Sequence, residues 1–372
     1  MAKIFTRYLY DLAHIKYSLL NTLITTTPKC DFKQVLFYAS ELYYSGHTKL
    51  LCDLLWKVYY DFYIVYYPKF ESMMNISYKK FQKTRDKKAL ITILYNLYLF
   101  EPYEGLFILS RCVKQTSVKQ KKIAWEDWMQ NYNIKQKKHS KYELGLAKSL
   151  EEGNILHSVG FARALFEVKP RRCINIVEKK IEKSIKFFTS YKLEKIIAEI
   201  YFYFDKKTEK TKPKQSIFKK IKGGEYLTYF VATNFIMPYR NWQVLKKKRR
   251  YKVSKEIGCF SDVHSQTKFD LINNWMKYAI HSEYWQKILE KYDGSYDEEK
   301  DKFVFKTDAQ KTEFESKYEF EIDEQSQKII AKSLYKVTEL SLFDWLAKLF
   351  WNDNEDGSYN HCMGHLKNKL IY

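Results

Sequence analysis

The chain of 372 residues carries 65 Lys and Arg against 44 Asp and Glu, a formal net charge of +21, and 17% of it is aromatic. Hydrophobic residues make up 45% of the chain, which excludes a wholly disordered protein, because so much apolar surface offsets the entropy of ordering. The 11 Gly and 6 Pro fall far below the roughly 45 of average usage, which argues against an all-β sandwich or barrel with many tight turns.

The first twenty residues predict neither a signal peptide nor a membrane span. Arg7, Asp11 and Lys16 interrupt the apolar run that a signal peptide requires. No stretch of the chain approaches 18 uncharged apolar residues. We therefore expect an intracellular protein, in the cytoplasm or nucleus, with no membrane partner.

The first 110 residues predict successive amphipathic helices. Apolar residues between 32 and 43 follow helical spacing, with Asp31 as the expected N-cap and Ser45-Gly46 as the stop. A second helix is expected over 50–67, closed by Pro68, and a third over 87–100. Short connections between such helices favour antiparallel hairpins in a bundle or array.

From 111 to 205 the pattern stays helical and becomes rich in Lys. Helices are expected over 155–167, 174–188 and 193–204, and the first two are divided by the residues from Lys169 to Arg172. Residues 206–222 are Lys-rich with little apolar content, which predicts an exposed linker or disordered loop.

The C-terminal part predicts a mixture of elements. Residues 226–231 fit either a strand or a buried helix, and 268–292 fit a helix. Between 290 and 324 the charge inverts to 13 acidic residues against 6 Lys. Residues 303–305 and 318–322 alternate with the strand period, so they predict a small β insertion around 307–317. Residues 325–351 fit a further helix.

These patterns predict a mainly α fold, a helical bundle or array followed by a second, mostly helical domain that carries the β insertion. The expected parts are an N-terminal helical domain over 1–205, the basic linker or loop over 206–222, a mixed domain over 223–351 and a polar tail over 352–372.

The strongest functional signal is the charge of residues 206–255, which hold 16 Lys or Arg against two Asp or Glu, a formal charge of +14. Clustered cations bind phosphates and release counterions, and neighbouring aromatic rings stack on unpaired bases. Lys169, Arg171 and Arg172 offer a secondary phosphate contact. The predicted nucleic-acid-binding residues are Lys219, Lys220, Lys222, Lys246, Lys247, Lys248, Arg249, Arg250, Lys252, Arg171, Arg172, Tyr251 and Trp242.

We therefore expect a non-catalytic protein that binds DNA or RNA. Its Lys-, Tyr- and Ile-heavy usage is typical of an AT-rich genome, such as that of a large DNA virus, in which case it would also occur in the virion. The same codon bias also produces a merely solvated Lys-rich surface. One alternative is a structural or capsid-associated assembly protein that binds protein partners. Another is a divergent nucleic-acid-processing enzyme.

The aromatic residues between 56 and 67 surround one predicted helix. Such a helix is either central to a core or part of a large protein interface. This segment is therefore the candidate contact for protein partners, and a core position is the alternative.

No cofactor, metal or catalytic residue is predicted. The six cysteines lie far apart without a C-x-x-C pair, which predicts free thiols. His361, Cys362 and His365 near the C-terminus lack a second ligand pair for zinc. Glu41, Asp61, His157 and His281 are expected to be buried and hydrogen-bonded rather than catalytic.

Overall fold

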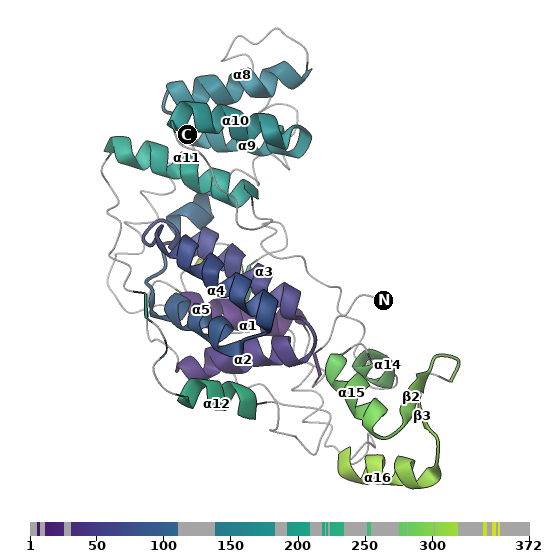
Figure 1. Ribbon diagram of the computed structural model, residues 1–372. Coiled ribbons are helices and arrows are strands. Elements are labelled where there is room, and N and C mark those ends of the chain that lie inside the picture. The colour runs from purple at the N-terminus through teal and green to yellow at the C-terminus, as the bar shows by residue number, and fades with distance from the viewer. Residues whose placement is uncertain are drawn as a thin grey trace.

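The computed structural model describes residues 6–7, 12–25, 31–110, 138–182, 192–208, 218–219, 221, 224–233, 251–253, 275–280, 282–300, 302–318, 338–340, 344–346 and 349. Within these ranges the protein is mainly α-helical, with short strands paired in two-stranded sheets (Figure 1). The predicted fold class, mainly α with a small β insertion, is confirmed.

The N-terminal helices form a bundle in which α1 packs on α2 and α4 packs on α5. Asp31 and Asp86 accept hydrogen bonds from the backbone N–H of Lys33 and Lys88, so each carboxylate caps the start of a predicted helix. After α2 the chain turns at Gly46, where φ is 78°. The bundle helices are α1 (Leu12–Ile24), α2 (Phe32–Tyr44), α3 (Thr48–Val58), α4 (Phe70–Thr84) and α5 (Lys87–Leu99).

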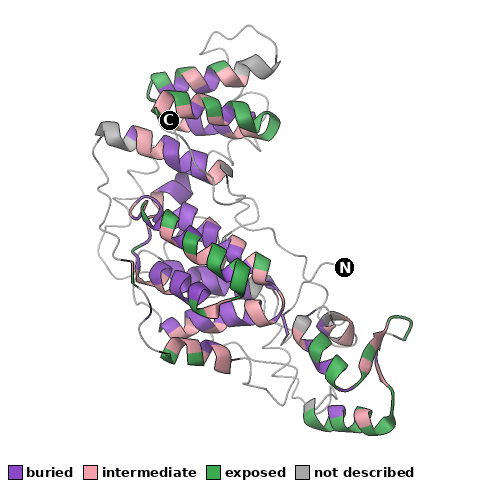
Figure 2. Cartoon of the chain, in the orientation of Figure 1, coloured by how far each residue is buried: buried purple, intermediate pink, exposed green. Residues whose placement is uncertain are grey.

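The helix expected over 50–67 ends in a π-helical turn, four residues short of its predicted end. Helix α3 passes directly into η1 (Tyr59–Tyr63). There the backbone N–H of Ile64 donates to the carbonyl of Tyr59, five residues earlier, at 3.0 Å. The aromatic side chains at 56, 59, 60, 62 and 63 are at most 1% exposed (Figure 2). These rings therefore belong to the protein's own core, one of the two alternatives for this segment.

A second helical group lies above the bundle in Figure 1. It comprises α8 (Lys138–Glu151), α9 (Ile155–Val168), α10 (Pro170–Ile181) and α11 (Lys192–Thr208). The prediction that 169–172 divides two helices is wrong in part, because Pro170 occupies the first position of α10. Proline is favoured there, since its missing N–H has no partner in that turn. Helix α10 ends before Glu182, which has a left-handed φ of 51°.

One buried and one partly buried ion pair anchor α11 to the bundle. Lys195 of α11 pairs with Glu71 of α4, and the Tyr60 hydroxyl donates to the same carboxylate at 2.9 Å. Lys57 Nζ lies 3.4 Å from Glu194 Oε1 and 3.6 Å from Asp61 Oδ2. Since buried charges are stable only when they are paired, these contacts fix the position of α11.

The described residues of the predicted linker are anchored to the bundle. The Lys219 N–H donates to Asn96 Oδ1 at 3.0 Å, and Asn96 Nδ2 donates to the Lys219 carbonyl at 3.0 Å. Ile221 is 7% exposed. The strand-or-helix alternative at 226–231 resolves to helix α12 (Glu225–Ala232), whose Phe230 is fully buried.

A small α/β unit follows, and two predictions for it need correction. The helix expected over 268–292 is broken, because the Ser282 hydroxyl caps a new helix by accepting from the Trp285 N–H at 3.2 Å. The strand predicted at 303–305 lies in β3, which pairs antiparallel with β2, with Gly294 opposite Phe305. The strand predicted at 318–322 is wrong at its first residue. Tyr318 ends a helix instead, and 319–322 lie outside the described residues. The elements of this α/β unit are α14 (Trp275–Ala279), α15 (Glu283–Lys291), β2 (Gly294–Asp297), β3 (Lys302–Phe305) and α16 (Asp308–Tyr318).

Distant parts of the chain meet in a second sheet and in the main core. Strand β1 (Tyr251–Val253) pairs in parallel with β4 (Thr338–Leu340). The helix predicted over 325–351 is therefore wrong at these three residues, because tertiary pairing decides so short a segment. Trp345 is fully buried against Phe107 and Phe62, with ring centroids 5.6 Å and 6.5 Å away. One hydrophobic cluster thus contains residues from both sides of 206–222, such as Phe204 and Phe230. The domain boundary predicted at 206–222 stays a prediction.

A candidate anion-binding cavity

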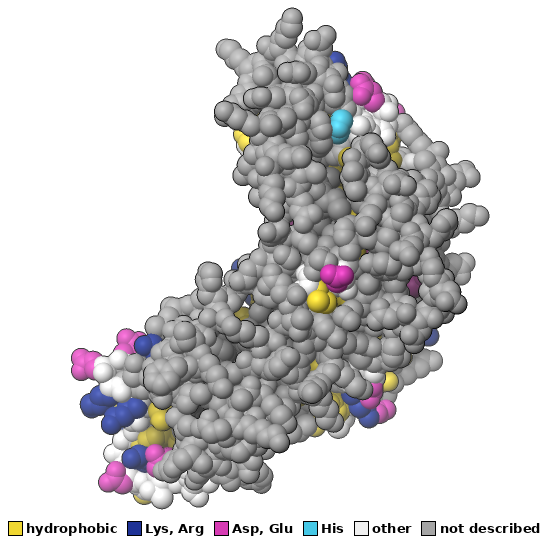
Figure 3. Space-filling model, turned by 180° about the vertical axis from the view of Figure 1, so that it is seen from behind, with side chains coloured by type: hydrophobic (Ala, Val, Ile, Leu, Met, Phe, Trp, Pro, Cys, Tyr) yellow, Lys and Arg dark blue, Asp and Glu magenta, His cyan; other side chains and the backbone are white. Residues whose placement is uncertain are grey.

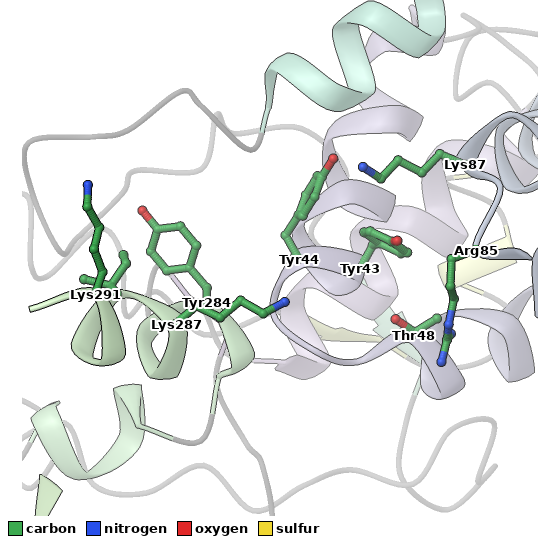
Figure 4. Close-up of a pocket in the computed structure, with 9 residues that line it drawn as sticks. Tyr43, Tyr44, Thr48, Arg85, Lys87, Tyr284, Lys287 and Lys291 are labelled. Atoms are coloured by element: carbon green, nitrogen blue, oxygen red, sulfur yellow. The ribbon is translucent and has the colours of Figure 1, made fainter. Parts of the chain in front are cut away.

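A cavity of about 540 Å³ lies between the N-terminal bundle and helix α15 (Figure 4). Its lining residues come from the α2–α3 junction, from the α4–α5 junction and from one face of α15. They are Tyr43, Tyr44, Thr48, Arg85, Lys87, Tyr284, Lys287, Ile288 and Lys291.

The bundle wall is built where four helix ends meet. Only two residues connect α4 to α5, so Arg85 and Lys87 emerge close together. Arg85 is the C-cap of α4 in a left-handed conformation with φ 54°, and its N–H donates to the Phe81 carbonyl at 2.8 Å. Glycine is usual at such caps because it has no Cβ penalty. Arg85 therefore takes a conformation that strains the backbone of a non-glycine residue, as do Glu182 and Asp293.

The wall formed by α15 follows from helical spacing. Tyr284, Lys287, Ile288 and Lys291 are separated by three, one and three positions, so they share one helix face. Ile288 is 9% exposed, whereas both lysines are exposed. Figure 4 shows Tyr284, Lys287 and Lys291 of α15 on one side of the cavity, with Lys87 and Tyr44 on the other.

Buried Arg7 holds the two walls together. Its Nε lies 2.9 Å from Glu41 Oε2 of α2, and both side chains are at most 1% exposed. Its Nη2 donates to the carbonyl of Thr233, the C-cap of α12, at 3.1 Å. The Trp285 indole of α15 donates to the Arg7 carbonyl at 2.6 Å. One residue thus ties the α15 wall to the bundle.

Cations also fix the tyrosine rings. The Arg7 guanidinium carbon lies 5.1 Å from the Tyr44 ring centre and 5.4 Å from that of Tyr284. Lys87 Nζ lies 5.5 Å from the Tyr44 ring centre, and such cation–π contacts are attractive. Burial raises the pKa of Tyr44 to about 12, so this phenol stays protonated at neutral pH and adds no negative charge to the cavity.

Among the described residues, the lining contains four basic side chains and no carboxylate. Within the described part of the chain, no carboxylate forms an ion pair with Arg85, Lys87 or Lys291. Cations gathered in a concave site focus a positive potential, and their hydrogen bonds to phosphate or carboxylate oxygens are the strong, charge-assisted kind. The arrangement is suited to an anion.

Of the residues predicted to bind nucleic acid, the three whose side chains the structure describes, Arg171, Arg172 and Lys219, do not line this cavity. Arg171 is exposed on α10, and Lys219 is exposed beside α5. Arg172 Nε pairs with Glu143 Oε2 at 3.0 Å, and Lys169 Nζ lies 3.2 Å from the other oxygen of that carboxylate. The structure therefore does not bring Arg171, Arg172 and Lys219 into one site.

The other predicted binding residues are described only in backbone or not at all. Tyr251 and Lys252 lie in β1, where the structure gives their strand pairing. The following lie outside the described residues: Lys220, Lys222, Trp242, Lys246, Lys247, Lys248, Arg249 and Arg250.

The cavity residues had a weak signal in the sequence. Residues 79–88 hold six Lys or Arg and a single Asp, a formal charge of +5 over ten residues, against +14 over the fifty residues 206–255. Acidic residues such as Glu283 and Glu290 lie beside the lysines of α15 in the sequence, so the net charge of that segment gives no sign of them. What joins the two groups is tertiary contact across about 200 residues.

Other chemistries have little support among the described residues. No group of three or more His, Cys, Asp or Glu is arranged to hold a metal ion in those ranges. Cys52 and Cys173 are free and buried, and burial raises the pKa of each thiol to about 12, which leaves them unreactive at neutral pH. His157 bonds to Asn154 in its own helix cap, while His281, His361, Cys362 and His365 lie outside the described ranges.

Across the described helices, none combines the length and the apolar content that crossing a membrane requires. Comparison with models of known protein families, with curated proteins and with solved structures finds no match. The chemistry of the cavity is therefore the ground on which a function can be argued.

Proposed function

We propose that this protein binds nucleic acid through the cavity between the bundle and α15. The observation that carries the proposal is the lining itself, in which the described residues combine four cations and three tyrosine rings with no carboxylate. Phosphate backbones supply the anions that such cations neutralise, and bases supply flat faces for the rings. A nucleic-acid ligand also fits the predicted cytoplasmic, nuclear or virion location.

The surface beside the cavity supports a polyanion rather than a small anion. Lys79, Lys83 and Lys88 are exposed around the α4–α5 junction, next to Arg85 and Lys87. In contrast, the outer surface of the small α/β unit mixes both signs of charge, as the lower left of Figure 3 shows. Asp86 is the single acidic residue of 79–88 and pairs with Lys80, so the remaining cations beside the cavity extend the site over several phosphates.

The test is a binding titration of the full chain with labelled single-stranded and duplex oligonucleotides, each from about 50 to 200 mM salt. We expect binding that weakens steeply with salt. In the variant R85Q/K87Q/K287Q/K291Q, the slope of log K against log salt should fall by about 2.8 for single strands and about 3.6 for duplex if all four cations contact phosphates.

A matched control removes four exposed lysines outside the cavity, in the variant K69Q/K179Q/K302Q/K311Q. Its net charge equals that of the cavity variant, so a general electrostatic effect would weaken both proteins alike. A third variant with Gln at 246–250 measures the contribution of the predicted basic run. No binding at low salt, or equal losses in the cavity variant and its control, would refute the proposal.

A further inference from the structure

The shape of the cavity bears on which nucleic acid enters it, and this question rests on the proposed function. Two rings at the end of α2 form one wall, and Tyr284 of α15 belongs to the other. Tyr43 and Tyr44 meet edge to face with ring centroids 5.0 Å apart, and Tyr43 also lies 6.0 Å from Phe81. Tyr284 meets Trp285 edge to face at 5.3 Å. The rings are therefore held in place before a ligand arrives.

The size of the cavity limits what can reach these rings. A volume of about 540 Å³ lies within the range of small-ligand sites, about 300–1,000 Å³. A base in a duplex is stacked between its neighbours, so it can reach such a pocket only after leaving the stack, at a cost of a few kcal/mol. A base in a single strand pays little of this cost.

The placement of charge matches one nucleotide with its flanking phosphates. Lys287 and Lys291 are exposed on α15, and Arg85 is exposed on the opposite wall, while the rings are half-buried between them. Phosphates at the rim and a base among the rings would satisfy both groups of side chains at once. An acidic peptide would satisfy the cations and leave the ring faces without a flat partner.

We infer that the cavity is a single-strand site, which takes one unpaired nucleotide with its base against the tyrosine rings and its phosphates on the four cations. Tyr284 supplies a stacking surface from α15, and Lys287 and Lys291 supply phosphate contacts. Selectivity for unpaired strands follows from the cost of unstacking a base.

The experiment compares a 12-nucleotide single strand with a duplex of the same sequence, by fluorescence anisotropy on the full chain. We expect the single strand to bind at least about tenfold more tightly, since a few kcal/mol of unstacking opposes the duplex. Tyr284→Leu should weaken single-strand binding by about 5- to 150-fold, as loss of a base–aromatic stack does. Tyr284→Phe keeps the ring and should bind within about threefold of the parent.

Two further arms separate the ring contacts from the phosphate contacts. K287Q/K291Q should lower the single-strand salt slope by about 1.4, whereas K302Q/K311Q in the same small unit should leave it unchanged. Thermal unfolding shows whether each variant is folded. If Tyr284→Leu is unfolded, the test of the inference rests on Tyr284→Phe and K287Q/K291Q.

The outcomes distinguish this inference from the proposed function. Equal affinity for duplex and single strand, with the salt slope still dependent on Lys287 and Lys291, overturns single-strand selectivity and leaves nucleic-acid binding intact. Displacement of the single strand by poly-glutamate at equal charge concentration would instead assign the cavity to an acidic protein partner. Absence of binding to every oligonucleotide overturns both proposals.

Discussion

The buried Arg7–Glu41 pair provides a quantitative test of how the two walls of the cavity are joined. At 2.9 Å and an effective dielectric constant of about 20, the attraction between the two charges is about 6 kcal/mol. The free-energy cost of removing both charges from water offsets much of this attraction. Removing one partner leaves the other charge buried without compensation, which typically costs about 3–5 kcal/mol.

Glu41→Leu should therefore lower the free energy of unfolding by about 3–5 kcal/mol, measured by urea denaturation. The double variant Arg7→Met/Glu41→Leu removes both charges, so it should cost less than the sum of the two single variants, with a coupling of about 2–3 kcal/mol. Exposed Lys33–Glu225 provides the control, with 3.2 Å between Nζ and Oε1. Glu225→Gln should cost less than about 1 kcal/mol. A cost of Glu41→Leu below about 1 kcal/mol, or simple additivity of the single variants, would refute the reasoning.

Two further predictions concern titratable groups. The pKa of Asp86 lies below its ordinary value, mainly because the carboxylate accepts a hydrogen bond from the Lys80 side chain. The stabilisation by this carboxylate is therefore present above about pH 4 and is lost as the pH falls through the lowered pKa. In urea titrations, Asp86→Asn should flatten that acid loss and Asp86→Ala should cost about 1 kcal/mol at pH 7; an unchanged acid profile in Asp86→Asn would contradict this assignment. For the buried thiols, a thiol reagent at pH 8 should label the same number of cysteines in the native C52S/C173S variant as in the native parent, and two fewer when both proteins are denatured. Fewer labelled cysteines in the native variant would show that these sulfurs are accessible.

Local signals in the sequence were sufficient for much of the helical architecture. Asp31 stands directly before apolar residues at helical spacing and caps α2 as expected. The third helix begins at Lys87 as expected, and Asp86 caps it, although this cap was not predicted. Such signals succeed because capping and amphipathic spacing are decided within a few residues. The same reasoning expected one helix over 268–292 and did not use Ser282, whose hydroxyl starts a second helix inside that range.

The remaining features depend on contacts between distant residues. Thr338–Leu340 is a strand only because it pairs with Tyr251–Val253, and nothing within three residues encodes that partner. Likewise, Arg85 and Lys287 lie 202 positions apart and share a cavity only after folding. A count of net charge over long segments selected 206–255 and passed over a site that combines the short basic run 79–88 with two lysines of α15.

The position of Trp345 in the bundle core has a consequence for how the chain is synthesised. Its ring lies beside the stacked pair of Phe62 and Phe107, yet 238 positions separate it from Phe107. At about 5–20 residues per second, translation needs roughly 12–48 s to cover that interval. Throughout this time the Phe62–Phe107 pair lacks the contact with Trp345. A chain that ends before residue 345 therefore exposes aromatic surface that chaperones recognise.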